Sequence, residues 1–179
     1  MKQDRVVYLD FLRVIATFAV VILHVASSKW DKTTVYSYDW QVMNIFDSLV
    51  RWCVPMFLMI SGVFFLDNTK NISSKDIYFK YIRRIFLALV FWGLLYGFTS
   101  LVVNLVINRR TFAFFDIIKI LSTLIFGPPW YHLWFLYLII GVYMLTPILR
   151  IFIANSSKKD IEYFIILYFL FGLLLPTLN

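Results

Sequence analysis

Hydrophobic residues in this 179-residue chain gather into five long apolar segments, separated by short polar connections. The segments cover approximately residues 8–27, 42–66, 85–107, 133–153 and 161–178. Each approaches the ~20 residues that an α-helix needs to cross a bilayer, where backbone groups must be satisfied within the helix. The pattern therefore predicts an all-α, polytopic membrane helix bundle with about five transmembrane helices. Pro55 removes a backbone donor and predicts a kink in the second helix.

A sixth apolar segment, residues 112–126, is too short for an ordinary crossing. Asp116, Lys119 and Thr123 recur at helical spacing along one side of it. Residues 127–129 read Gly-Pro-Pro, which a helix cannot continue through. We therefore predict a short helix that lies in the membrane interface or is re-entrant.

The composition excludes an ordinary soluble domain, because 61% of the residues are hydrophobic and only 15% are charged. The net charge of +7 does not indicate nucleic acid, since Lys and Arg lie in short clusters between apolar segments. The most basic connection, residues 67–84, contains Lys70, Lys75, Lys80, Arg83 and Arg84. By the positive-inside rule this connection is cytoplasmic, which places the N-terminus in the cytoplasm and the end of the fifth span outside.

The first apolar segment carries a polar stripe. Asp10, Arg13, Thr17 and His24 are spaced so that they share one helical face, and the step from Arg13 to His24 is a rotation of only ~20° with a rise of ~16 Å. Taken singly, Asp10 and Arg13 could be an ion pair at the membrane edge and His24 an interfacial histidine. Taken together they favour a functional site, because polar residues within spans are costly and usually line a cavity.

Three further residues are candidates for a binding site. Arg51 follows Asp47 by four positions on one face, so it is either an outer-edge anchor or a buried functional cation. His132 and Trp134 begin the fourth span. They either belong to an aromatic belt at the membrane surface or join His24 in one pocket. The chain has no P-loop, dinucleotide glycine fingerprint or zinc-ligand cluster, so the sequence predicts neither a metal site nor nucleotide hydrolysis.

Three stretches resemble a known family. The run YLDFLRVIATFAVVILH ends at His24 and contains Arg13, and it resembles the Arg-x10-His opening of the acyltransferase-3 family of bacterial membrane proteins. VPMFLMISGVFFL (54–66) resembles the family's Pro-x-Phe-Phe-x-x-Ser-Gly stretch, and HLWFLYLIIGVYMLTPIL (132–149) is similar to a third family stretch. The three occur in the family's order and extend the resemblance over the whole chain.

The resemblance implies an enzyme of the bacterial cytoplasmic (inner) membrane. Such an enzyme moves an acyl group, usually acetyl, from cytoplasmic acyl-CoA to a hydroxyl of a cell-envelope sugar outside, as in enterobacterial-common-antigen-type O-acetyltransferases. Acyl-CoA is then a donor substrate rather than a bound cofactor, and the partners are the bilayer, acyl-CoA and an envelope glycan. The resemblance also implies further helices, so we expect residues 1–179 to be the N-terminal half of the domain.

The chemistry of acyl transfer suggests a role for each ionisable residue of the stripe. Acyl transfer to an alcohol needs a base, which predicts His24, and Arg suits contact with a phosphate-bearing donor, which predicts Arg13. We expect Asp10 to orient Arg13, and Arg51, His132 and Trp134 to contact substrate. Two other functions stay open: a non-catalytic module that transports a small polar solute such as an amino acid, and a structural membrane subunit.

Overall fold

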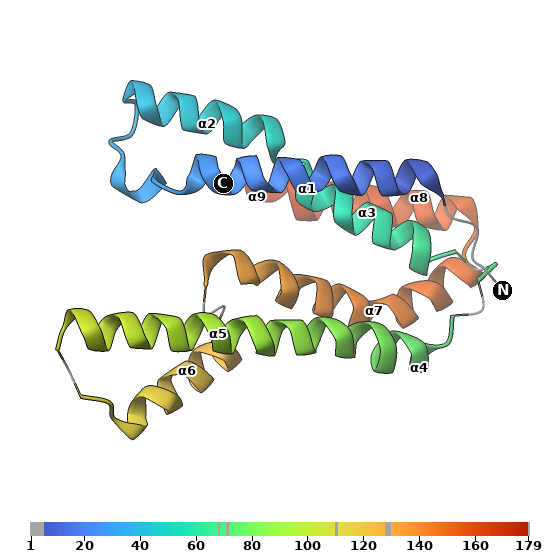
Figure 1. Ribbon diagram of the computed structural model, residues 1–179. Coiled ribbons are helices and arrows are strands. Elements are labelled where there is room, and N and C mark those ends of the chain that lie inside the picture. Colours follow the sequence, from blue (N-terminus) through green and yellow to red (C-terminus); the bar gives the residue numbers. More distant parts are fainter. Residues whose placement is uncertain (1–5, 68, 71, 110, 128–129, 179) are drawn as a thin grey trace. The chain divides into compact units, whose positions relative to one another are not determined.

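The computed structural model describes residues 6–67, 69–70, 72–109, 111–127 and 130–178 (Figure 1). The chain divides into two compact units, Met1–Phe64 and Phe65–Asn179. The first unit contains α1 (Val7–Ser27), η1 (Trp30–Lys32), α2 (Tyr38–Val50) and α3 (Cys53–Phe65), whose last residue belongs to the second unit. The second contains α4 (Ser74–Asp76), η2 (Ile77–Ile82), α5 (Arg83–Ile107), α6 (Phe114–Phe126), η3 (Tyr131–Leu133), α7 (Trp134–Asn155), α8 (Lys158–Leu167), η4 (Tyr168–Leu174) and α9 (Leu175–Thr177).

The predicted fold class is confirmed, because the described residues form helices and connections with no strand. Five stretches are long and apolar enough to cross a membrane: Val7–Ser27, Tyr38–Phe65, Ser74–Ile107, Phe114–Asn155 and Lys158–Thr177. They match the five predicted spans in order, to within one residue at their C-terminal ends or beyond them, and Phe114–Asn155 also takes in the short helix α6. The protein is therefore a multi-pass membrane protein.

Small residues bring the helices of the first unit together. Ala16 and Ala19 of α1 pack against Val50 and Cys53, and all four are buried. Small side chains allow helix backbones to approach closely, which is how helices associate when lipid removes the hydrophobic driving force. This contact fixes which face of α1 is turned inwards.

The second span is interrupted where Pro55 predicted a kink. Helix α2 ends at Val50, Arg51 and Trp52 form a turn, and α3 begins at Cys53. A proline at position 55 cannot donate to the carbonyl of Arg51 four residues earlier, and its ring crowds that carbonyl. The break therefore lies one helical turn before the proline.

The third span begins earlier than the sequence pattern suggested. A continuous helix starts at Ser74, where Ser73 forms a capping box: the Ser73 hydroxyl accepts from the Lys75 amide at 3.2 Å, and the Asp76 carboxylate accepts from the Ser73 amide at 3.1 Å. These bonds satisfy backbone donors that a helix start leaves open. The connection predicted over residues 67–84 is therefore shorter, and Lys75, Lys80, Arg83 and Arg84 lie on a helix.

Helix α6 has the predicted short length. Its 13 residues span about 20 Å at 1.5 Å per residue, less than the ~30 Å thickness of the hydrocarbon core. The helix ends at Phe126 with Gly127 as its C-cap, and Pro128 and Pro129 lie outside the described residues. Figure 1 shows α6 turning back towards α5 after the connection that follows α5.

Gly97 sets the separation of α5 and α6. A Cβ atom at this position would lie 2.7 Å from Cγ2 of the buried Ile120, which has little freedom to move. We expect Gly97→Ala to lower the free energy of unfolding by about 1–3 kcal/mol through overpacking. Gly141 of α7 is the matched control, because its added Cβ would meet nothing within 4 Å. Gly141→Ala should be neutral or stabilising by up to about 1 kcal/mol through helix propensity, and thermal unfolding in detergent compares the two.

Arg150 of α7 holds the turn that precedes the third span. Its guanidinium donates to the carbonyls of Phe65, Asp67 (3.5 Å) and Lys70 (2.9 Å). Nearby, the amide and hydroxyl of Thr69 donate to the Asp67 carboxylate and lower the pKa of that group. Arg150 thus supplies a donor to the carbonyl of Phe65, the last residue of α3, and further donors to two carbonyls of the turn that follows.

We expect Arg150→Ala to destabilise the protein by roughly 2–3 kcal/mol, because it removes charge-assisted hydrogen bonds to three carbonyls, of which those of Asp67 and Lys70 keep a backbone donor. Arg150→Lys should restore only part of the loss, since an ammonium lacks the planar fork that reaches several acceptors. Lys158→Gln is the control: its ion pair with Glu162 is exposed and should matter little. Equal thermal midpoints for Arg150→Ala and the parent chain would contradict a stabilising role.

Candidate functional site

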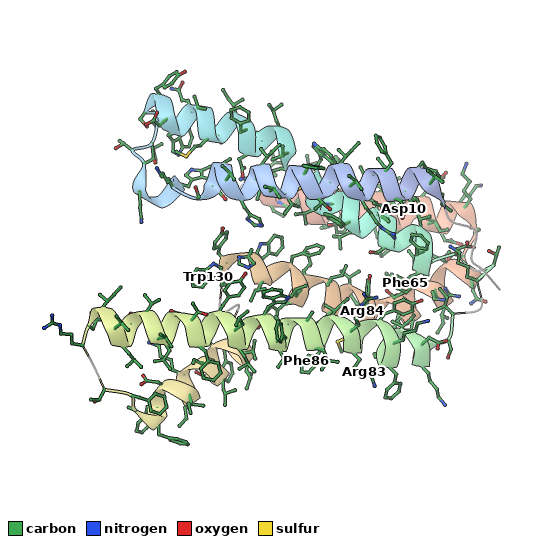
Figure 2. All side chains as sticks on the ribbon, viewed as in Figure 1. Asp10, Phe65, Arg83, Arg84, Phe86 and Trp130 are labelled. Atoms are coloured by element: carbon green, nitrogen blue, oxygen red, sulfur yellow. The ribbon has the colours of Figure 1, made fainter. Side chains whose placement is uncertain are left out.

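The predicted stripe lies on one unbroken helix. Helix α1 runs from Val7 to Ser27, so the one-face arrangement expected of Asp10, Arg13 and His24 holds along its length. Asp10, labelled in Figure 2, accepts a hydrogen bond from Arg13, with Nη1 3.2 Å from Oδ1. The Arg13 guanidinium also lies over the Phe64 ring, with Cζ 4.8 Å from its centroid. The Arg13 side chain is 42% exposed, so a ligand can reach it.

His24 occupies the other end of the stripe. It lies in the last turn of α1, is half-buried, and has a buried Nδ1 atom. At 100° per residue, Arg13 is only about 60° from the buried Ala16 around the helix. The stripe therefore borders the packed face of α1 rather than lying opposite to it, and its polar groups are partly shielded from surrounding solvent or lipid.

Arg51 is held by a buried acid and an aromatic ring. Its Nε atom donates to Oδ2 of Asp47 at a distance of 2.5 Å, and Asp47 is only 3% exposed. Its guanidinium lies 5.9 Å from the Trp30 ring centroid, a cation–π arrangement. Trp40 contacts Trp30 edge-on at 6.4 Å and Tyr36 at 5.7 Å. The predicted pairing of Arg51 with Asp47 is confirmed, and the three aromatic side chains gather beside it.

His132 lies in an aromatic group of the second unit. Its ring is edge-on to Tyr96 at 5.1 Å and to Tyr131 at 5.2 Å, and Tyr96 also stacks on Trp130 at 5.6 Å. Figure 2 shows Trp130 beside α5. Trp134 is 44% exposed and makes an edge contact with Phe135. The aromatic surroundings expected for His132 are present, and a pocket shared with His24 stays a prediction.

Sequence reasoning missed a basic groove at the start of the third span. Lys80, Arg83 and Arg84, with Phe79 and Leu87, line a hollow of about 410 Å3. Figure 2 labels Arg83 and Arg84 at the beginning of α5. The signal was present in the sequence, because the capping box at Ser73 indicates that a helix starts there. Spacings of three and four residues on a helix then make residues 80, 83, 84 and 87 neighbours. We refer to these five residues as the basic groove.

The stripe and the groove belong to a chain that matches one family over almost all of its length. A family model described as an acyltransferase domain matches residues 6–179. The chain belongs to the acyltransferase-3 family. Comparison with curated proteins and with solved structures found no match.

Membership of the acyltransferase-3 family makes this chain a membrane acyltransferase in general terms. The three stretches that resemble the family can now be assigned to helices of the structure. The Arg13 to His24 motif forms the stripe of α1, residues 54–66 lie mainly in α3, and residues 132–149 cover the end of η3 and most of α7. The first stretch and most of the second therefore lie in the first unit.

Proposed function

We propose that this acyltransferase-3 protein transfers an acetyl or other acyl group from cytoplasmic acyl-CoA to a hydroxyl of an extracytoplasmic envelope sugar. The single observation that carries the proposal is the stripe of α1, in which a cation and a histidine lie on one face at opposite ends of a membrane-spanning helix. Such a helix can bind a donor at one depth and activate an acceptor at another.

His24 acts as the general base. Its imidazole takes the proton of the acceptor hydroxyl while the oxygen attacks the thioester carbonyl carbon. The new C–O bond forms, the C–S bond breaks, and the imidazolium returns its proton to the departing CoA thiolate. The half-buried position of His24 limits competing attack by water.

Arg13 binds the donor below His24. The rise between them is ~16 Å, which is of the order of an extended pantetheine arm, so a donor held near Arg13 can present its thioester at His24. The guanidinium suits phosphate oxygens, and Asp10 fixes its orientation through the 3.2 Å bond. The 42% exposure of Arg13 leaves room for this contact.

The basic groove is a second feature that favours a phosphate-rich donor. Lys80, Arg83 and Arg84 concentrate three positive charges around a hollow of about 410 Å3. The nucleotide end of CoA carries several phosphate charges, which such a cluster attracts. By the positive-inside rule this groove and the N-terminus are cytoplasmic, in the bacterial inner membrane, where acyl-CoA is available.

The remaining candidate residues bind the acceptor sugar. Arg51 is fixed by Asp47 and Trp30, and its side chain is 67% exposed, so it can donate to a sugar hydroxyl or carboxylate. His132 and Trp134 offer polar and aromatic groups for the same purpose.

The experiment supplies membranes containing the protein with acetyl-CoA labelled in its acetyl group. We expect label to appear in an envelope glycan as an ester that mild alkali releases. Absence of ester label, together with protein-dependent uptake of labelled serine into sealed vesicles, would favour the transport alternative and overturn the proposal.

A further inference from the structure

A polar hollow lies between α5 and α6 in the second unit. Its volume is about 390 Å3, within the ~300–1,000 Å3 range of small-molecule sites. Its polar lining residues are Ser100, Asn104, Asn108, Asp116, Lys119 and Thr123. We call this hollow the α5–α6 pocket. None of these six residues has a role in the acyl transfer described above.

The pocket exists because two helices touch and then diverge. Gly97 and Ile120 make the close contact, and Figure 1 shows α6 moving away from α5 towards the connection between them. Ser100, Asn104 and Asn108 follow one another by four residues, so they share the face of α5 that opens onto this space.

Two of the polar side chains in the described part of the pocket make their hydrogen bonds within their own helix. The Asn104 amide donates to the Ser100 carbonyl at 2.8 Å, and the Thr123 hydroxyl donates to the Lys119 carbonyl at 2.8 Å, so both bonds stay within one helix. Within the described part of the chain, the Asn108 amide and the Lys119 ammonium have no hydrogen-bond partner. Polar residues within membrane helices cost free energy, and they usually mark a site or pathway for a substrate.

The charges of the lining balance. Lys119 is positive and Asp116, three residues earlier, is negative, so neither sign dominates. The Asp116 carboxylate is buried and accepts from the Ala113 amide at 2.9 Å, at the positive end of α6. What remains for a ligand is an ammonium, amides and hydroxyls, which together donate and accept hydrogen bonds. The ring hydroxyls of a sugar, which also donate and accept hydrogen bonds, match these groups better than an ion does.

We propose that the α5–α6 pocket binds one neutral, hydroxyl-rich sugar unit. Binding requires neither an acyl donor nor His24, so the inference goes beyond acyl transfer. Only the further step, that the sugar is part of the acceptor glycan, rests on the proposed function.

The single cysteine of the chain makes a labelling test possible. Cys53 is buried, and Cys53→Ala provides a thiol-free background. In this background Thr123→Cys places a thiol in the pocket, and Ser122→Cys places one beside it, outside the lining. We expect N-acetylglucosamine, added to membranes without acyl donor, to slow methanethiosulfonate labelling of Thr123→Cys about tenfold at nine-tenths occupancy and to leave Ser122→Cys unchanged.

Further variants distinguish the possible outcomes. Asn104→Leu or Lys119→Met, combined with Thr123→Cys, should abolish protection by the sugar. No protection at Thr123→Cys, equal protection at both thiols, or protection by serine or phosphate but not by the sugar would overturn the proposal. Protection of Thr123→Cys by the sugar, in membranes whose protein keeps His24 but gives no ester label from acetyl-CoA, would leave the pocket intact while the proposed function fails.

Discussion

Replacing His24 with alanine is expected to lower acetyl transfer by about 10²–10⁴-fold, the usual contribution of a general base. Without the imidazole, the acceptor hydroxyl keeps its proton and attacks the thioester poorly. Since His24 lies in the last turn of α1, the substitution leaves the packed contact of Ala16 and Ala19 in place. Labelled transfer from acetyl-CoA in membranes, normalised to the amount of protein, measures the effect.

The control for His24→Ala is Ser28→Ala, one turn further along. Ser28 is exposed, and its hydroxyl donates to the Val25 carbonyl at 2.8 Å, so its loss perturbs the same helix end without removing a base. We expect transfer in Ser28→Ala to stay close to the parent value. His24→Gln keeps hydrogen-bonding groups but cannot act as a base, and it should be as inactive as His24→Ala. Full activity in His24→Gln would refute the assignment.

Replacing Arg13 with glutamine is expected to raise KM for acetyl-CoA about 10–100-fold, which corresponds to the loss of charge-assisted hydrogen bonds to a phosphate. The Asp10 carboxylate then loses its 3.2 Å hydrogen bond from Arg13, and its negative charge disfavours an anionic donor. Arg13→Lys should restore little of the apparent affinity for acetyl-CoA, because one ammonium cannot reproduce the planar, two-pronged contact of a guanidinium with phosphate. Initial rates at varied acetyl-CoA separate KM from kcat.

Asp10 and a lysine of the second unit provide the controls for Arg13. The double variant Asp10→Asn with Arg13→Gln also removes the negative charge of the Asp10 carboxylate, so KM should fall part of the way back towards the parent value. Lys158→Gln removes an exposed cation in an ion pair and should leave KM unchanged. A normal KM in Arg13→Gln, with kcat alone reduced, would mean that Arg13 does not bind the donor.

The sequence predicted those features that depend on local pattern. Spans of about 20 apolar residues follow from the bilayer thickness, and the α1 stripe follows from helical periodicity. The break beside Pro55 and the pairing of Arg51 with Asp47 were also readable, since both depend on neighbours within four residues. The start of the third span at Ser74 was readable from its capping box, but the surrounding polar residues resembled a connection.

Features that depend on distant parts of the chain could not be predicted. The Arg150 guanidinium donates to carbonyls about 80 residues away in sequence, and no local pattern indicates such acceptors. The α5–α6 pocket is similar, because Asn104 and Lys119 become neighbours only when Gly97 lets the two helices meet. Polar residues at four-residue spacing in α5 were visible in the sequence, but their partner helix was not.

The central claim is that α1 supports transfer from a donor on the cytoplasmic side to an acceptor on the other side. It is tested most directly with sealed inner-membrane vesicles of known orientation, in which labelled acetyl-CoA is supplied to one face and ester label is measured on glycan at the opposite face. We predict labelling only when the cytoplasmic face receives the donor, and none with His24→Ala. Labelling from the external face, or equal labelling with His24→Ala, would contradict the account.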